Sequence, residues 1–165
     1  ATKNWTYHTI NADELTGIPS QTLEIAQEKA KQKNLSGWLL TLDYPCYHSV
    51  MTYSSNRALR EKFYYAYNTR ASELNTEYPA LDNTEIINQI LFLRQKLATI
   101  LGFENFAELS LATKMAKNPQ DVLNFLNQLV EKSRAQALME FKQLEDFAKQ
   151  HLAIEPLTAW DVAYV

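Results

Sequence analysis

This 165-residue sequence contains little glycine or cysteine and has only a small excess of negative charge. It contains three glycines and one cysteine, and its 16 basic residues are offset by 19 acidic ones, for a net charge of -3. Three glycines are few for a fold built on tight turns and phosphate-binding loops, so helices should dominate. A single cysteine cannot form an internal disulfide, which agrees with a reducing compartment. The scattered basic residues leave no face for a phosphate backbone, which argues against nucleic acid as a partner.

Long apolar runs and a secretory leader are missing as well. No run approaches the roughly 18 apolar residues that a membrane span needs. The first residues, ATKNWTYHTINADEL, show no charged segment followed by an apolar one. We therefore expect a cytoplasmic protein with no membrane partner. With 46% hydrophobic residues, a chain of this length can bury the core of one domain.

The apolar pattern of the first half predicts helices around one short strand. Residues 38–42 form a brief apolar run that stops before Pro45, which predicts a buried strand followed by a turn. From about Ser55, apolar residues recur at helical spacing over roughly five turns. These residues are Leu59, Phe63, Tyr67, Ala71 and Leu74. An earlier helix is expected over 21–33 with Ser20 as its N-cap, whereas residues 1–18 show no clean period.

Helix-end signals organise the second half. Asp82 and Glu85 resemble a capping box, and they open a helix that should end at Gly102. One side of that helix carries Ile87, Ile90, Leu91, Arg94, Leu97 and Leu101. Asn105 with Glu108 repeats the capping pattern for a short helix that ends near Lys117.

A long helix is expected next. Asn118 as N-cap, Pro119 at the first helical position and Asp121 in the first turn are three agreeing start signals. Neither glycine nor proline interrupts the pattern before His151. We therefore predict an all-α fold, an irregular multi-helix bundle with one short strand element near 38–42 and one long helix near 119–151. No repeat or linker divides residues 1–165, so a single helical unit is expected.

Reactive groups do not gather in the sequence. The HExxH motif of zinc peptidases is missing, and the three histidines, His8, His48 and His151, lie far apart. Surface or partnered histidines are favoured over a metal site built from them. Cys46 lies close to His48, but a small buried hydrophobe is favoured over a Cys/His nucleophile.

A carboxylate pair is the remaining catalytic candidate. Glu104 and Glu108 can share a helical face, but helix capping and solvation are favoured over acid–base catalysis. The sequence therefore predicts no catalytic residue and no metal-binding residue in this chain.

The aromatic helix after Ser55 is a candidate peptide-binding surface. It carries three tyrosines and three arginines, Tyr64, Tyr65, Tyr67, Arg57, Arg60 and Arg70, residue types favoured where a surface is both apolar and hydrogen-bonding. The favoured alternative is that Tyr67 packs in the core and the arginines pair with Glu61 or Glu73. The candidate substrate-facing residues are Tyr64, Tyr67 and Arg70. Trp160-Asp161, near the end, carries no interpretation on its own.

Three stretches closely resemble the thimet oligopeptidase family of zinc metallopeptidases. They are GWLLTLDYPCYHSVMTYSSNRALREKFYYAYNTRAS, DNTEIINQILFLRQKLATILGFENFAELSLATKMAKNPQDVLNFL and AWDVAYV. The resemblance implies a largely helical cytoplasmic peptidase whose two lobes enclose a narrow channel that admits short peptides. It places the zinc ligands and general base on an HExxH helix and a following glutamate, downstream of the matched region. No residue of this chain corresponds to them, so zinc is expected only in the parent enzyme.

The resemblance also implies that both ends fall inside the family's continuous sequence. We therefore expect an internal fragment or a truncated gene product, a noncatalytic wall piece whose partners are the remainder of the parent peptidase and its short peptides. This chain departs from the family pattern near its end, where relatives usually have Pro-Trp-Asp and this sequence has Ala159-Trp160-Asp161. The alternative is a stand-alone helical binding or assembly module. In either case, exposed apolar surface would favour self-association of the isolated chain as a symmetric dimer.

Overall fold

The computed structural model describes residues 2–165, and helices dominate this range, which confirms the predicted fold class. The β-strands are β1 (Thr6–Thr9) and β2 (Trp38–Thr41), and the short 3-10 helices are η1 (Ala12–Leu15) and η2 (Pro79–Leu81). The α-helices are α1 (Ser20–Gln32), α2 (Tyr44–Tyr53), α3 (Arg57–Asn68), α4 (Thr84–Ile100), α5 (Phe106–Leu111) and α6 (Pro119–Leu152).

The chain forms two compact units. The first unit runs to Asp82 and resumes at Leu144, and the second unit spans Asn83–Gln143. The first unit therefore contains both strands, α1 to α3 and the end of α6, while the second contains α4, α5 and the beginning of α6.

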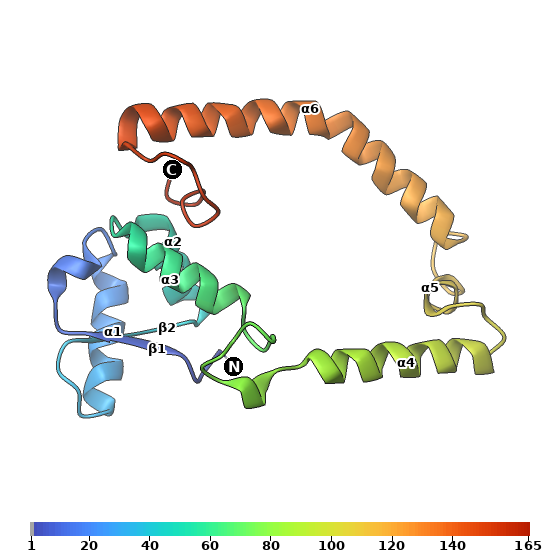
Figure 1. Ribbon diagram of the computed structural model, residues 1–165, viewed down its shortest axis with the longest axis horizontal. Helices are drawn as coiled ribbons and strands as arrows, with labels where there is room; N and C mark the ends of the chain where they lie inside the picture. The colour runs from blue at the N-terminus through green and yellow to red at the C-terminus, as the bar shows by residue number, and fades with distance from the viewer. Residues whose placement is uncertain (1) are drawn as a thin grey trace. The chain divides into compact units, whose positions relative to one another are not determined.

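A two-stranded antiparallel sheet lies beside α1 in the first unit (Figure 1). Its register pairs Thr6 with Thr41 and Thr9 with Trp38. The central residues of β2, Leu39 and Leu40, are buried, which confirms the predicted strand. Its partner β1 was not predicted because residues 6–9 alternate too weakly to signal a strand before the pairing is known.

Side chains from β1, η1, α1, β2, α2 and α3 meet in one apolar core. Phe63 of α3 is fully buried, and the edge of its ring faces Trp5 with the ring centroids 4.9 Å apart. The buried residues of this core are Trp5, Leu15, Ile18, Ala26, Leu40, Leu42, Val50, Met51, Leu59 and Phe63. The core therefore joins segments that are widely separated in the sequence.

The segment after β2 differs from the prediction. The predicted turn at Pro45 is wrong, because α2 begins at Tyr44 and Pro45 lies in its first turn. Proline is tolerated there, since the first turn of a helix needs no backbone N–H donors. Helix α3 starts close to the predicted position, with the side chain of Asn56 accepting a hydrogen bond from Leu59 N, but it ends at Asn68 instead of continuing to Leu74.

The predicted end of α4 at Gly102 agrees with the structure. Gly102 has a φ of +81°, and Phe103 N donates to Ala98 O at 2.9 Å while Gly102 N donates to Thr99 O at 3.1 Å. These two bonds form the Schellman motif at the end of α4. The N-cap of α4 is Asn83 rather than Asp82.

The caps of α5 and α6 agree with the sequence, although α5 is shorter than predicted. Asn105 Oδ1 accepts from Glu108 N at 3.0 Å, and α5 ends at Leu111 rather than near Lys117. Asn118 Oδ1 accepts from Asp121 N at 2.8 Å, so α6 begins at Pro119 as predicted.

Gly17 sits where the backbone leaves no room for a side chain. Its φ is +90°, and a Cβ added there would lie 2.2 Å from Tyr53 O. We predict that Gly17→Ala lowers the free energy of unfolding by about 3 kcal/mol, because it adds a backbone clash to an unfavourable φ. Chemical denaturation measures the loss. Gly102→Ala is the matched control, since a Cβ at Gly102 meets nothing within 4 Å, and equal losses in the two variants would contradict this account.

Candidate functional site

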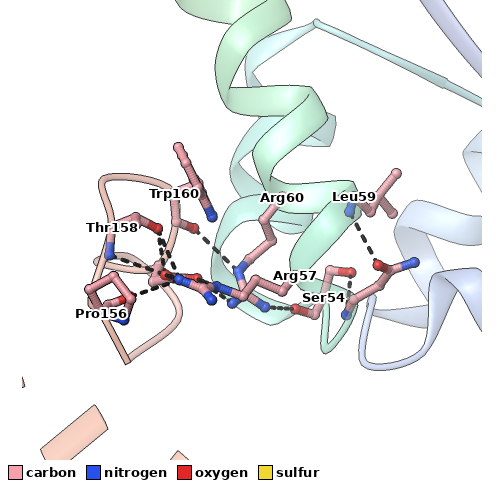
Figure 2. A network of polar contacts seen from close by, with 9 residues as sticks. Ser54, Arg57, Leu59, Arg60, Pro156, Thr158 and Trp160 are labelled. Atoms are coloured by element: carbon pink, nitrogen blue, oxygen red, sulfur yellow. Dashed lines mark hydrogen bonds and ion pairs between the residues drawn. The ribbon is translucent and has the colours of Figure 1, made fainter. Parts of the chain in front are cut away.

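The strongest polar cluster in the described chain joins the start of α3 to the loop that follows α6. Arg57 and Arg60 lie one turn apart on α3, so their side chains leave the helix on the same side. Figure 2 shows both side chains reaching toward the loop that carries Pro156, Thr158 and Trp160. Their shared partner is Asp161, more than a hundred residues away in the sequence.

The carboxylate of Asp161 is surrounded by donors. Arg57 Nη2 donates to Asp161 Oδ2 at 2.8 Å, and Arg60 Nη2 donates to Asp161 Oδ1 at 2.7 Å. Thr158 adds its hydroxyl at 2.6 Å and its backbone N–H at 3.2 Å, both to Oδ2. The side chain of Asp161 is 0% exposed, so these bonds replace its entire hydration shell.

Arg60 is the buried cation of the cluster, with a side chain that is 1% exposed. Its Nη1 donates to Ser54 O at 2.7 Å and its Nε donates to Trp160 O at 3.2 Å. Its guanidinium also lies 4.0 Å from the centre of the Tyr164 ring. The planar guanidinium thus binds three separate backbone or carboxylate groups at once, which a lysine ammonium could not do with the same geometry.

The electrostatics of Asp161 are set by two opposing effects. Burial raises the pKa of the Asp161 carboxyl, and hydrogen bonds from Arg57, Thr158 and Arg60 more than offset that effect, leaving the pKa at about 2. The pKa of Arg57 is raised, chiefly by its hydrogen bond to Asp161. Arg57 and Asp161 therefore keep their charges at neutral pH, and their ion pair anchors the loop rather than exchanging protons.

The interpretation that Arg57 and Arg60 pair with Glu61 or Glu73 is therefore wrong for their ion pairs, although the charge of Glu61 also acts on Arg57. Both arginines instead share Asp161, for which no partner was predicted. The carboxylate lies across the fold, so no local spacing on the helix could identify it.

The candidate substrate-facing residues lie on α3 and directly after it. The rings of Tyr67 and Tyr47 stack with centroids 3.8 Å apart, and the guanidinium of Arg70 lies 3.5 Å from the centre of the Tyr67 ring. Arg70 also donates to Tyr67 O at 2.6 Å. Tyr64 is partly buried against the core, 6.0 Å from the Trp160 ring between centroids. All three residues are half-buried, and their role toward a peptide stays a prediction.

The other reactive candidates have ordinary partners. Cys46 Sγ accepts from Thr41 N at 3.5 Å, and burial raises the pKa of the Cys46 thiol, which opposes formation of the nucleophilic thiolate. Glu108 Oε2 accepts from Glu104 N at 3.1 Å, so this carboxylate caps α5.

The three histidines lie on different elements. His8 on β1 hydrogen bonds through Nε2 with Ser36 O at 2.7 Å, while the His48 ring lies 5.7 Å from Tyr44 and the His151 ring 4.7 Å from Phe147. Across residues 2–165, no three histidine, cysteine, aspartate or glutamate side chains gather in a group that could hold a metal ion. The residues present in this part of the chain therefore do not fit a zinc site. None of the described helices is long and apolar enough to cross a bilayer.

We predict that Asp161→Asn lowers the free energy of unfolding by about 3 kcal/mol, because it leaves the buried Arg60 guanidinium without its counter-ion. Urea unfolding followed by circular dichroism measures the difference. Asp13→Asn, which removes an exposed carboxylate from the same unit, should change stability by less than about 0.5 kcal/mol. A small effect of Asp161→Asn would show that the cluster contributes little.

The same carboxylate predicts a pH dependence. Because folding lowers the pKa of Asp161 to about 2, its contribution to stability is complete above the unfolded-state pKa of about 4 and is lost as pH falls toward 2. Urea midpoints measured at several pH values should therefore fall over this interval. The fall should be smaller in the Asp161→Asn variant, and identical profiles would rule out Asp161 as the cause.

Comparison with known proteins places these features in a family context. The sequence profile of Peptidase family M3 matches residues 50–165. Oligopeptidase A of Escherichia coli is 48% identical over 164 residues, which cover 99% of this chain and 24% of the relative. Oligopeptidase A of Haemophilus influenzae is 44% identical, and the probable cytosolic oligopeptidase A of Arabidopsis thaliana is 38% identical, each over 99% of this chain. The chain spans about a quarter of the length of these relatives.

Proposed function

This chain belongs to Peptidase family M3, and on that premise we propose that it is a noncatalytic helical part of a cytoplasmic zinc metallo-oligopeptidase that degrades short peptides. Its role there is to shape the wall of the substrate channel and so to limit substrate size. The observation that carries the proposal is the match to oligopeptidase A over 99% of this chain but only 24% of the relative.

The chemistry of the described residues supports a noncatalytic role. The strongest polar cluster is an anchor made of groups that keep their charges at neutral pH. The zinc would be bound by other parts of the longer protein, where it would polarise the scissile carbonyl and activate water. The cytoplasmic location is supported by the single cysteine and by the name of one Arabidopsis relative, the probable cytosolic oligopeptidase A; another Arabidopsis relative is named as organellar.

Within this proposal, the peptide-facing surface consists of residues of α3 together with Arg70, which follows the C-cap of that helix. Tyr67 and Arg70 form a stack of an aromatic ring and a guanidinium, and Tyr64 lies one turn before Tyr67. Such a surface offers apolar contact together with charged donors for the carbonyls or the carboxylate of a short peptide.

A second candidate is a stand-alone helical assembly module. It is favoured by the large exposed apolar side chains on α4 and on the beginning of α6, which are suited to binding another protein surface or a second copy of this chain as a symmetric dimer. Sedimentation as a monomer at high concentration would count against it.

A chimera tests the peptidase proposal. We predict that Escherichia coli oligopeptidase A, with its matched 164 residues replaced by this chain, cleaves short peptides. Arg70→Gln in the chimera should raise KM several-fold at unchanged kcat, because it removes a charge that contacts bound peptide and leaves the zinc chemistry intact. Arg70→Lys should restore part of the affinity.

Two controls accompany the chimera. Lys31→Gln removes an exposed cation of α1 and should leave both constants unchanged. The isolated chain should cleave nothing. Zinc-dependent cleavage by the isolated chain, free of contaminating enzyme, would overturn the noncatalytic role, and an Arg70→Gln chimera with unaltered KM would remove Arg70 from the peptide-facing surface.

A further inference from the structure

The second unit lacks a core of its own. Among residues 83–143, Ala98 is the one buried residue. The first unit, in contrast, buries ten residues in a single apolar cluster. A helix of ordinary composition gains most of its stability in water from packing of its apolar side. Helices α4 and α5 and the beginning of α6 therefore need a covering surface that the second unit does not supply by itself.

Helix α4 shows the uncovered surface most clearly. Eight aliphatic side chains fall within an arc of about 180° when successive residues are set about 100° apart. These are Ile86, Ile87, Ile90, Leu91, Leu93, Leu97, Ile100 and Leu101, and their exposed fractions run from 41% to 71%. We call this set the apolar face of α4. Phe92, on the opposite side of the helix, is 67% exposed.

The start of α6 is uncovered in the same way. Leu123, Leu126 and Leu129 follow one another at helical spacing and are between 48% and 51% exposed. Leu138, about 60° further around the helix from Leu123, is 62% exposed. Between α5 and the first turn of α6 lies an apolar groove of about 370 Å³, lined by Ala107, Ser110, Leu111, Pro119, Val122 and Leu123.

The family relationship indicates what covers these side chains. The apolar face takes up half of the circumference of α4, and the opposite half is mostly polar, with Asn88, Gln95 and Thr99 beside Phe92. A helix with such an apolar stripe turns it toward a core. Because the matched region is 24% of oligopeptidase A, about three quarters of such a protein lies outside it and is available to surround both helices.

We propose that the remainder of a longer polypeptide packs around α4, α5 and the beginning of α6, and that residues 83–143 fold stably only with that cover. This inference rests on the proposed function, because it takes the occupant from the family relationship. The first unit does not depend on the cover, since its core and the Asp161 cluster are complete within the chain.

Hydrogen exchange read by mass spectrometry tests the inference on the 165-residue chain itself. Amides of α1, β2, α2 and α3 should exchange at least about 100-fold more slowly than in an unfolded chain. Amides of α4 and α5 should exchange at rates within about tenfold of the unfolded-chain rate. In the chimera with Escherichia coli oligopeptidase A, the amides of α4 should become as protected as those of α3.

Three outcomes would overturn the inference. Strong protection of α4 in a chain that sediments as a monomer would show that the second unit needs no cover. Protection that appears only as the concentration rises, together with a dimer in sedimentation, would assign the cover to a second copy. A chimera that folds but leaves α4 unprotected would show that the remainder of the peptidase does not cover it.

A pair of variants locates the covered surface without any measurement of activity. Leu97→Lys places a charge in the middle of the apolar face of α4, whereas Asn88→Lys places the same charge on the opposite side. In the chimera, Leu97→Lys should lower the thermal midpoint by several degrees and Asn88→Lys should not. In the isolated chain, neither variant should move the unfolding of the first unit, and equal shifts in the chimera would contradict a cover over this face.

Discussion

One buried carboxylate joins the two separated segments that make up the first unit. A charge that has left water must find partners inside the protein or it destabilises the fold. Asp161 finds them in Arg57 and Arg60, which belong to a helix about a hundred residues earlier. The guanidinium groups then reach beyond the carboxylate to Ser54 O, Pro156 O and Trp160 O. In this way one ion-pair cluster fixes the backbone of the loop after α6 against the start of α3.

The two units differ in how completely their surfaces are matched. The first unit satisfies its buried charges and packs its apolar residues within the described chain, as Asp161 and Phe63 illustrate. The second unit exposes side chains such as Leu91 and Ile100 that belong in an interior. This contrast agrees with membership of a peptidase family whose curated members are about four times longer than the chain. On this view the first unit is a self-supporting element, and the second is a contribution to a core that other parts of the protein complete.

Local signals in the sequence were sufficient to predict several helix ends. Asn118, Pro119 and Asp121 predicted the start of α6, and Gly102 predicted the end of α4, because caps depend on residues within one turn. The same reasoning failed at Pro45. Proline suits both a loop and the first turn of a helix, and the neighbouring residues did not show which of the two forms here. Asp161 could not be recognised, since its significance comes from two arginines that only the folded chain brings near. The family resemblance was readable from sequence, but the exposure of α4 needed the structure.

Limited proteolysis followed by size-exclusion chromatography tests this account most directly. If the first unit is complete and the second lacks its cover, a protease should cut within residues 83–143 first. The two resulting pieces, one ending near Asp82 and one beginning near Leu144, should then elute together because the Asp161 cluster and the shared packing still hold them. First cuts within α1 to α3, or pieces that separate at neutral pH, would contradict the account.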